Sequence, residues 1–384
     1  MIRRDFMKMA GTSALPIGYA SASMAPQAEG GKTGRRALMK VGTQQWPGLG
    51  GPNAYSADTL RVLAALGVNH LCRTLPVEVS DTWKAESMIR LRERTEKFGI
   101  YIDQILCPLS DSFRNIMKGT PGRDQEIDKV CELIREVSKA GIPLLQYYLN
   151  FIVGVPRSGW KTGRGGSRGS AFVYAEAKQD PPLTDAGPVS EEDYWERATY
   201  LLKRVVPVAA EYKIKMGCHP QDPSMPYGKP FRGVYRALTT PEHLQHYLDI
   251  VPSPYHCLHF CQGTVEEMLE KPGEQIYDVI RHFGRQGKII SVHFRNITGT
   301  RGNFRETFID EGDVDMLKAC RVYKEVGFDG MLMPDHVPQI VSDSAAGDLP
   351  AAGGATRGDF NSSVGFAFTF GYIKALIAAV DAEG

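Results

Sequence analysis

The chain has 384 residues, of which 42% are hydrophobic, and its 45 basic and 44 acidic residues leave a formal net charge of +1. A chain of this size can bury one large core, and barrels of alternating strands and helices commonly occupy this length as a single domain. The balanced charge argues against a nucleic-acid surface, and the sequence lacks the run of about 18 apolar residues that a membrane-spanning helix needs.

The N-terminal segment 1–25 differs in character from the rest of the chain. Arg3 and Arg4 are followed by Phe6 and Lys8, a weakly apolar run and an A-x-A sequence at 20–22. This order is typical of a twin-arginine export signal. The alternative is a disordered basic start on a cytoplasmic protein. We therefore expect a signal at 1–25, a linker at 26–37, a folded domain at 38–384 and export to the periplasm.

Short β-rich apolar runs then alternate with longer segments of helical period. Strands are predicted at 38–45, 68–73, 100–106, 143–150, 213–219, 255–260, 288–294 and 329–334. Helices are predicted at 57–66, 83–98, 124–140, 191–211, 240–251, 265–284, 313–326 and 365–381. Gly99, Gly141 and Gly327 follow three of these helices, as helix C-termini favour. Eight consecutive strand and helix pairs predict an α/β fold of the (β/α)8 TIM-barrel class.

A doubly wound open sheet is the alternative, but no G-x-G-x-x-G motif follows the first strand. Two long irregular stretches, 151–190 and 337–362, follow strands four and eight. In a barrel they would lie over the C-terminal face, where active sites are built. The seven cysteines are odd in number and scattered through apolar segments, which indicates buried thiols rather than a disulfide framework.

Four consecutive predicted strands each end on a side chain that can bind a metal, and these are His219, Cys261, His293 and Asp335. Neighbouring barrel strands lie about 4.8 Å apart, so these side chains can converge on one ion about 2 Å from each. A single histidine or cysteine at a strand end is usually a packed core residue. Four at equivalent positions predict a metal site. His256, His259 and Cys218 are competing ligands that stand further from the loops.

The combination of imidazole, thiolate and carboxylate suits a borderline divalent ion such as Mn²⁺, Fe²⁺ or Zn²⁺. With four protein ligands, a substrate can bind only if the coordination number rises above four. This favours Mn²⁺ or Fe²⁺ over a closed tetrahedral zinc.

Several motifs resemble those of the metal-dependent mannonate dehydratase family, within the xylose-isomerase-like barrel superfamily. They are HPQDP (219–223), CQGT (261–264), HFRNI (293–297), EGDVDM (311–316) and PDH (334–336), with KGTPGRDQEI (118–127) similar to a further segment. The resemblance runs from about residue 38 to the C-terminus. It implies loss of water from D-mannonate to give 2-keto-3-deoxy-D-gluconate, a reaction of hexuronate catabolism within carbohydrate metabolism. It also implies Mn²⁺ or Fe²⁺ on His219, Cys261, His293 and Asp335, with His336 as the acid or base.

Dehydration of a 2,3-dihydroxy acid needs a base for the C2 proton, an acid for the leaving C3 hydroxyl, and a cation that stabilises an enediolate. An imidazole that titrates near neutrality suits either proton role, which supports His336 beside Asp335. Arg295, two residues after His293, is a candidate clamp for the substrate carboxylate. The alternative for Arg295 is a salt bridge at the barrel rim.

The sequence also departs from the family pattern. The family has a tyrosine and an arginine before its last helix, in a segment like GYGLYDR, whereas NSSVGFAFTFGYIKAL (361–376) has neither at those positions. Gln221 stands where an acidic residue is usual. The basic segment 157–170 is either a solvated loop or a lid that presents cations to a sugar acid. The acidic residues Glu306, Asp310, Glu311 and Asp313 are interpreted mainly as a helix start.

Three other functions stay open at this point. A sugar isomerase or epimerase on the same barrel would need a carboxylate pair, for which Asp103 and Glu78 are the candidates. A metallo-endonuclease would need a basic groove, against which the neutral charge argues. A sugar-binding protein would bind its ligand without turnover. The expected partner is a small sugar acid and not a nucleic acid, and the oligomeric state is left open, a homo-oligomer included.

Overall fold

The computed structural model describes residues 36–46, 49, 55–150, 155–178, 185, 187–340 and 363–384. The predicted export signal, almost all of the predicted linker and most of the loop after the last strand lie outside these ranges.

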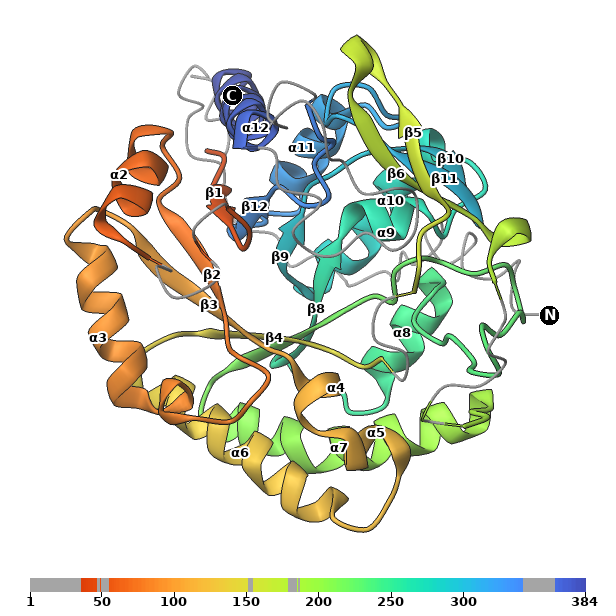
Figure 1. Cartoon of the computed structure of the whole chain (residues 1–384). Helices are drawn as coiled ribbons and strands as arrows, with labels where there is room; N and C mark the ends of the chain where they lie inside the picture. Colours follow the sequence, from red (N-terminus) through yellow and green to blue (C-terminus); the bar gives the residue numbers. More distant parts are fainter. Residues whose placement is uncertain are drawn as a thin grey trace, which may run out of the picture.

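Eight parallel strands close into a barrel in the order β1-β12-β9-β8-β7-β4-β3-β2 (Figure 1). They are β1 (Lys40–Thr43), β2 (His70–Thr74), β3 (Tyr101–Cys107), β4 (Leu144–Tyr148), β7 (Lys215–His219), β8 (His256–Cys261), β9 (Ile289–His293) and β12 (Met331–Met333). Each corresponds to a predicted strand. The first strand pairs with both β2 and β12. Because a doubly wound open sheet cannot close in this way, the TIM-barrel prediction is confirmed.

The predicted helices are also present, with ends shifted by a few residues. They are α2 (Ala57–Ala65), α3 (Ala85–Glu96), α6 (Arg123–Lys139), α7 (Glu191–Glu211), α8 (Pro241–Asp249), α10 (Pro272–Arg285), α11 (Met316–Glu325) and α12 (Ser363–Ala382). Helix α9 (Gln262–Glu266) precedes α10, because Pro272 starts a new helix at a position that proline favours. Shorter helical segments are α4 (Leu109–Ser112), α5 (Arg114–Lys118), η1 (Asp81–Trp83), η2 (Arg164–Gly166) and η3 (Tyr174–Glu176).

The helix ends follow the local chemistry of the chain. Gly99, Gly141 and Gly327 have φ values of 69°, 70° and 72°, the left-handed conformation that a helix stop requires. At the N-terminus of α11 the side chain of Asp315 accepts a hydrogen bond from the Lys318 amide. A helix therefore starts after the four acidic residues of 306–313, but its cap is Asp315, which is none of the four, and Glu306 belongs to strand β11 (Asn303–Glu306).

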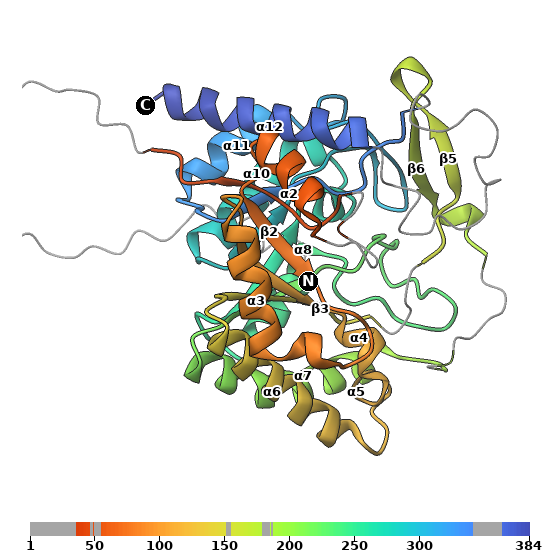
Figure 2. The same ribbon diagram turned by 60° about the vertical axis from the view of Figure 1, so that its left-hand side comes forward.

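A second sheet, which the sequence did not predict, lies beside the barrel. It has the order β10-β11-β6-β5 and consists of β5 (Gly159–Thr162), β6 (Arg168–Val173), β10 (Ile297–Thr300) and β11 (Asn303–Glu306). Part of the stretch expected to be irregular is thus the hairpin β5–β6, which projects away from the barrel in Figure 2. Buried Phe172 and Phe304 are register partners across β6 and β11. Pairing between segments far apart in sequence therefore builds this sheet.

The barrel interior is packed and partly polar. Cys72, Leu106, Met331 and Met333 form a buried cluster, and the Gln104 amide donates to Gln146 Oε1 over 2.6 Å. All seven cysteines are free and buried, as the sequence predicted.

Helix α12 is long and apolar enough to cross a membrane by length and composition alone. This qualifies the expectation of no spanning segment. However, α12 packs against α11 and β1, and Phe366, Phe370 and Ile373 on it are fully buried. A buried core helix can have the same length and apolar composition, so these two properties alone are weak evidence of a membrane span.

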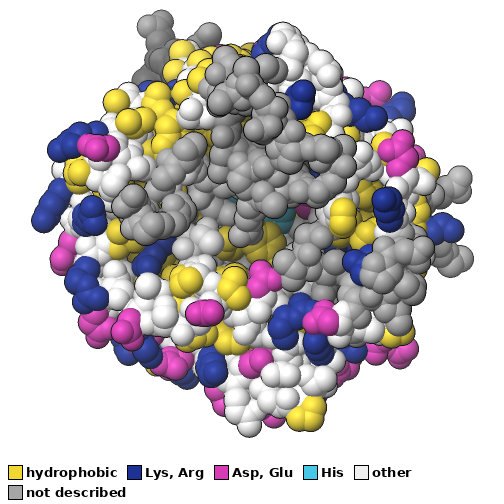
Figure 3. Space-filling model, in the orientation of Figure 1, with side chains coloured by type: hydrophobic (Ala, Val, Ile, Leu, Met, Phe, Trp, Pro, Cys, Tyr) yellow, Lys and Arg dark blue, Asp and Glu magenta, His cyan; other side chains and the backbone are white. Residues whose placement is uncertain are grey.

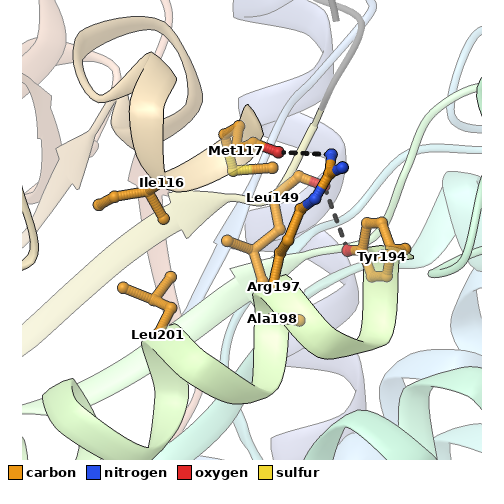
Figure 4. A pocket seen from close by; sticks show the side chains of 7 residues that line it. All are labelled: Ile116, Met117, Leu149, Tyr194, Arg197, Ala198 and Leu201. Carbon is orange, nitrogen blue, oxygen red and sulfur yellow. Dashed lines mark hydrogen bonds between the residues drawn. The ribbon is translucent and has the colours of Figure 1, made fainter. Parts of the chain in front are cut away.

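A small cavity of about 10 Å³ lies where α7 packs against α5 and the end of β4 (Figure 4). Its lining is mostly apolar. Its two polar groups are paired, since Arg197 Nη1 donates to the Met117 carbonyl and the Tyr194 hydroxyl donates to the Leu149 carbonyl. A space of this size holds at most about one water. The cavity is therefore a packing gap and not a ligand site.

Candidate active site

The four predicted metal ligands meet at one end of the barrel. His219, Cys261 and His293 are the last residues of β7, β8 and β9, and Asp335 lies two residues after β12. Their donor atoms all lie within 4.8 Å of one another, and all four residues are buried. Parallel register explains the convergence, because Cys261 pairs with His293 across β8 and β9.

The surroundings of these side chains fit a divalent cation. His219 Nδ1 lies 2.6 Å from the Pro220 carbonyl, which leaves the lone pair on Nε2. In the part of the chain that the structure describes, neither ring nitrogen of buried His293 makes a hydrogen bond, although Nδ1 lies 3.2 Å from Asp335 Oδ2. A buried imidazole without hydrogen bonds beside a carboxylate is costly unless a further group binds there. These residues therefore form a candidate metal centre.

Outer hydrogen bonds hold two of the candidate ligands in place. Gln45 Nε2 donates to Asp335 Oδ1 over 2.7 Å, and Thr264 Oγ1 donates to Cys261 Sγ over 3.1 Å. Partners of this kind orient metal ligands in known sites.

The electrostatics also favour a cation. Burial, with a smaller effect from His293, lowers the pKa of His219 to about 3, so this ring is neutral. Burial raises the pKa of the Cys261 thiol to about 12, so a nearby positive charge is needed to make it a thiolate. Burial opposes ionisation of Asp335, but His293 and His336 outweigh it and hold the pKa of Asp335 well below its usual range.

The competing ligands lie outside this cluster. His259 Nδ1 is 2.6 Å from Ser291 Oγ, and the centroids of the His259 and His293 rings are 4.1 Å apart. His256 is the first residue of β8, at the opposite end of the strand from Cys261, and its Nδ1 contacts the Val251 carbonyl. Cys218 directs its thiol to the His219 carbonyl. The preference for the last ligand-type residue of each strand therefore agrees with the geometry.

His336 lies beside the cluster, as expected for a proton carrier. Its Nε2 is 3.7 Å from Asp335 Oδ2, and its Nδ1 is 2.9 Å from Glu306 Oε1. Burial opposes its protonation, but Asp335 and Glu306 outweigh it and raise the pKa of His336 above its usual value.

Arg295, the candidate clamp for the substrate carboxylate, contacts protein acceptors in this structure. Its Nη1 donates to Glu306 Oε2 over 2.7 Å. Its Nη2 donates to Asp222 Oδ2 over 2.9 Å, to Glu267 Oε1 over 2.9 Å and to Thr264 Oγ1 over 3.0 Å. The side chain is 3% exposed. Both terminal nitrogens of the guanidinium group thus bind protein acceptors, as the alternative of a salt bridge at the barrel rim expects, and Nε lies 3.4 Å from Asp335 Oδ2.

Sequence reasoning gave no role in the site to the carboxylates that surround Arg295, and it interpreted one of them, Glu306, as part of a helix start. Asp222 follows β7, Glu267 follows α9 and Glu306 ends β11. Burial and the charge of Asp222 raise the pKa of Glu267 to about 8. Glu306 belongs to the hairpin of β10 and β11, whose two-residue turn is Arg301-Gly302. A glycine in a two-residue turn between strands is a sequence signal of a hairpin, and Gly302 has the positive φ, 72°, that such a turn needs.

One cation of the basic segment 157–170 reaches the site. Arg157 is 8% exposed, and its Nη2 lies 2.7 Å from Asp222 Oδ1 and 3.2 Å from Glu306 Oε1. Arg164 instead pairs with Asp310 near the surface, and Lys161 is exposed on β5. The segment is therefore an ordered part of the second sheet that contributes one buried arginine.

Residues that differ from the family pattern make packing or hydrogen-bond contacts here. Phe366, from the segment without the family tyrosine and arginine, is fully buried and packs edge-on against Trp46 with ring centroids 6.3 Å apart. Gln221 donates through Nε2 to the Leu149 carbonyl over 2.7 Å, which ties the loop after β7 to the end of β4.

The carboxylates considered for an isomerase lie elsewhere. Asp103 accepts from His70 Nδ1 at 2.5 Å, near the start of β2 and the opposite end of the barrel from the metal ligands. Glu78 is exposed in the segment after β2. Neither belongs to the group of residues whose donor atoms converge at the candidate metal centre.

In the view of Figure 3, histidine surface is visible near the middle of the face. Charged side chains of both signs are scattered around it. This face therefore has no broad basic groove among the residues that are coloured.

Fold and site together define a (β/α)8 barrel with a candidate metal centre at the C-terminal ends of its strands. The family model for D-mannonate dehydratase (UxuA) matches residues 182–359, which include all four candidate ligands and His336. Mannonate dehydratase 2 of Halalkalibacterium halodurans is 30% identical over 294 residues, which cover 68% of this chain and 80% of the relative. The chain belongs to the mannonate dehydratase family. It is accordingly a hydro-lyase, a sugar-acid dehydratase.

Two solved structures support the same fold. The mannonate dehydratase of Streptococcus suis serotype 2 aligns with a TM-score of 0.73 at 24% identity, covering 89% of this chain and 95% of that one. A xylose isomerase domain protein of Planctomyces limnophilus aligns with a TM-score of 0.53 at 15% identity, covering 91% and 98%.

Proposed function

We propose that this chain removes water from D-mannonate to give 2-keto-3-deoxy-D-gluconate, with Mn²⁺ or Fe²⁺ held by His219, Cys261, His293 and Asp335. One observation carries the proposal: four ligand side chains with donor atoms within 4.8 Å of one another lie beside an imidazole, in a family whose relatives bear the name mannonate dehydratase.

The choice of ion follows from the donor set. One thiolate, one carboxylate and two imidazoles suit a borderline divalent metal. Substrate binding requires a coordination number above four, which Mn²⁺ and Fe²⁺ accept more readily than a closed tetrahedral zinc.

The reaction breaks the C2–H and C3–O bonds, forms an enol and releases water, after which the enol becomes the 2-keto product. When bound, the divalent ion supplies positive charge that stabilises the negative charge developing on the substrate carboxylate. His336 accepts the C2 proton or donates a proton to the leaving C3 hydroxyl. Arg295 acts indirectly, because it holds the carboxylates of Asp222, Glu267 and Glu306 around the site.

The test is to incubate the protein, loaded with Mn²⁺ or Fe²⁺, with a panel of aldonic acids that includes D-mannonate, and with keto sugars. We expect a 2-keto-3-deoxy acid, detected as the mass loss of one water, from D-mannonate before the other acids. Metal-free protein is the control. Mass-neutral conversion would select an isomerase instead, and binding without any turnover would select a sugar-binding protein.

We also propose that residues 1–25 direct export of the folded protein to the periplasm by the twin-arginine route. The supporting observation is the Arg3-Arg4 pair followed by Phe6, Lys8 and the A-x-A sequence. Replacing Arg3-Arg4 by Lys-Lys should keep the protein in the cytoplasm, because the pair is read by a receptor and not only as charge. Cell fractionation measures this, and unchanged export would contradict it.

A further inference from the structure

We propose that Glu306 is a positioning residue that keeps a proton on Nδ1 of His336, so that Nε2 is the atom that exchanges protons with the substrate. This inference rests on the proposed function only in its expected effect on kcat. The hydrogen bond itself is a property of the folded chain.

Glu306 is held firmly at the end of β11. The residue is 1% exposed, and its Oε2 accepts from Arg295 Nη1 over 2.7 Å. Its other oxygen, Oε1, lies 2.9 Å from His336 Nδ1. A buried carboxylate with one oxygen fixed by an arginine has little freedom, and its second oxygen then sets the orientation of the imidazole ring.

Arg157 offers a competing arrangement, because its Nη2 lies 3.3 Å from His336 Nδ1. If Nδ1 accepted that hydrogen bond, its lone pair would also face the Glu306 carboxylate at 2.9 Å with no proton between them. If Nδ1 carries the proton, the remaining conflict is between two donors at 3.3 Å. Arg157 Nη2 can instead donate to Glu306 Oε1 at 3.2 Å, and it forms an ion pair with Asp222 Oδ1 at 2.7 Å. The protonated Nδ1 is therefore the arrangement of lower energy.

With Nδ1 committed to Glu306, the opposite ring nitrogen faces the reaction. His336 Nε2 lies 3.7 Å from Asp335 Oδ2, on the side of the candidate metal ligands. During turnover Nε2 gains the C2 proton or loses one to the C3 hydroxyl, and exchange with solvent restores the starting state. Nδ1 keeps its proton throughout.

The second sheet provides the support for Glu306. Strand β11 pairs with β6, where Arg305 is the register partner of Ala171. A Cβ atom at Gly169 would overlap the carbonyl oxygen of Glu306, so glycine there allows β6 to lie against the backbone of Glu306. The sheet outside the barrel thus has a function in the active site.

Glu267 offers a matched control. It is fully buried, and its Oε1 accepts from Arg295 Nη2 over 2.9 Å, much as Glu306 accepts from Nη1. Its second oxygen accepts from the Ser224 amide over 3.2 Å rather than from His336. Glu267→Gln therefore perturbs the same arginine while the contact between Glu306 and His336 is kept.

The first experiment does not depend on turnover. Protein labelled with ¹⁵N-histidine and loaded with diamagnetic Zn²⁺ is studied by NMR, and the His336 signals are assigned by their loss in His336→Gln. We expect a proton bonded to Nδ1 of His336 in the wild type and in Glu267→Gln, and its loss or rapid exchange in Glu306→Ala. A wild-type His336 whose only proton is on Nε2, as the Arg157 arrangement requires, would overturn the proposal.

The second experiment is a double-mutant cycle on the Mn²⁺-loaded enzyme with D-mannonate. Glu306→Ala should lower kcat by about 10–10²-fold with little change in KM or metal content, the usual loss for an outer partner. In a His336→Ala background the same change should cost nothing more, because Glu306 acts through that imidazole.

Glu306→Gln, which keeps an oxygen acceptor, should recover part of kcat and also serves if Glu306→Ala folds poorly. Additive losses in the two backgrounds, or a loss no larger than that of Glu267→Gln at equal folded fraction, would contradict the proposal. If no aldonic acid is turned over, the proposed function fails, and the NMR experiment still decides the role of Glu306.

Discussion

Asp335 and His336 are adjacent in the chain, and yet their side chains face the same site, with Asp335 Oδ2 3.7 Å from His336 Nε2. On a regular strand, consecutive side chains point to opposite faces. Strand β12 ends at Met333, directly before Pro334, and His336 has a left-handed backbone with φ 48°. The chain therefore leaves strand geometry at the proline, and this change of direction brings carboxylate and imidazole together.

The two neighbours should fail differently when they are changed. Asp335→Ala should lose metal and activity together, because it removes a proposed ligand. His336→Ala should keep the metal while turnover falls by about 10²–10⁴-fold, the usual range for a general acid or base. Metal content by elemental analysis and kcat are measured on both variants. Normal turnover by metal-loaded His336→Ala would make the imidazole structural.

Cys261→Ser should lower metal occupancy, because a hydroxyl is a poor substitute for a thiolate ligand. We expect about one ion per wild-type chain after reconstitution with Mn²⁺ or Fe²⁺. Cys320→Ser is the control, since Cys320 is also buried and contacts Met39 away from the site. Equal metal content in the two variants, or no metal in the wild type, would count against the site.

Gly263→Ala should disturb the charged cluster. A Cβ atom there would lie 2.7 Å from Arg295 Cζ, so the guanidinium group must move away from its carboxylates. We expect a loss of about 1–3 kcal/mol in the free energy of unfolding, as for other overpacked sites, together with reduced activity.

The control for Gly263→Ala is Gly371→Ala within α12, where an added Cβ meets no atom within 4 Å. This variant should gain about 0.5–1 kcal/mol, because alanine favours a helix over glycine. Urea denaturation measures both. A loss at Gly371 as large as that at Gly263 would show that the Arg295 contact is not the cause.

Glu136 predicts a dependence of stability on pH away from the active site. Its hydrogen bond from Lys139, assisted by the amide of Ala85 at the start of α3, lowers the pKa of Glu136 against the opposing effect of burial. A carboxyl whose folded-state pKa is lowered stabilises the fold above its unfolded pKa, about 4.3, and loses that contribution as the pH falls through the folded value. Glu136→Gln should therefore be less stable than the wild type at pH 7, and the difference should shrink below about pH 4.

The control for this effect is Glu132→Gln on the same helix, since Glu132 pairs with Lys84 at the surface with a side chain 54% exposed. Its stability difference from the wild type should be small at every pH, because exposed ion pairs contribute little. Chemical denaturation between about pH 3 and pH 7 measures both variants across the range that contains the carboxyl pKa. A constant difference for Glu136→Gln would show that its hydrogen bonds, and not its charge, matter.

The eight barrel strands and the four candidate ligands could be predicted from the sequence, because both depend on local patterns. Each strand is a short apolar run between helical segments, and Val292 and His293 show how such a run ends on a polar side chain. Closure of a parallel barrel then brings the strand ends together wherever such residues stand. The motif at 334–336 likewise predicted that the chain leaves strand geometry there, since proline cannot continue a central strand.

The tertiary structure alone decided which charges meet around those ligands. Arg157, Asp222 and Glu306 lie on segments far apart in sequence, and nothing in their local patterns pairs them. Their meeting depends on antiparallel pairing of β6 with β11 and on the close approach that Gly169 allows. It also decided that Arg295 binds the carboxylates of Asp222, Glu267 and Glu306. Long-range pairing and burial determine these contacts, whereas periodicity along the chain reports only on neighbours.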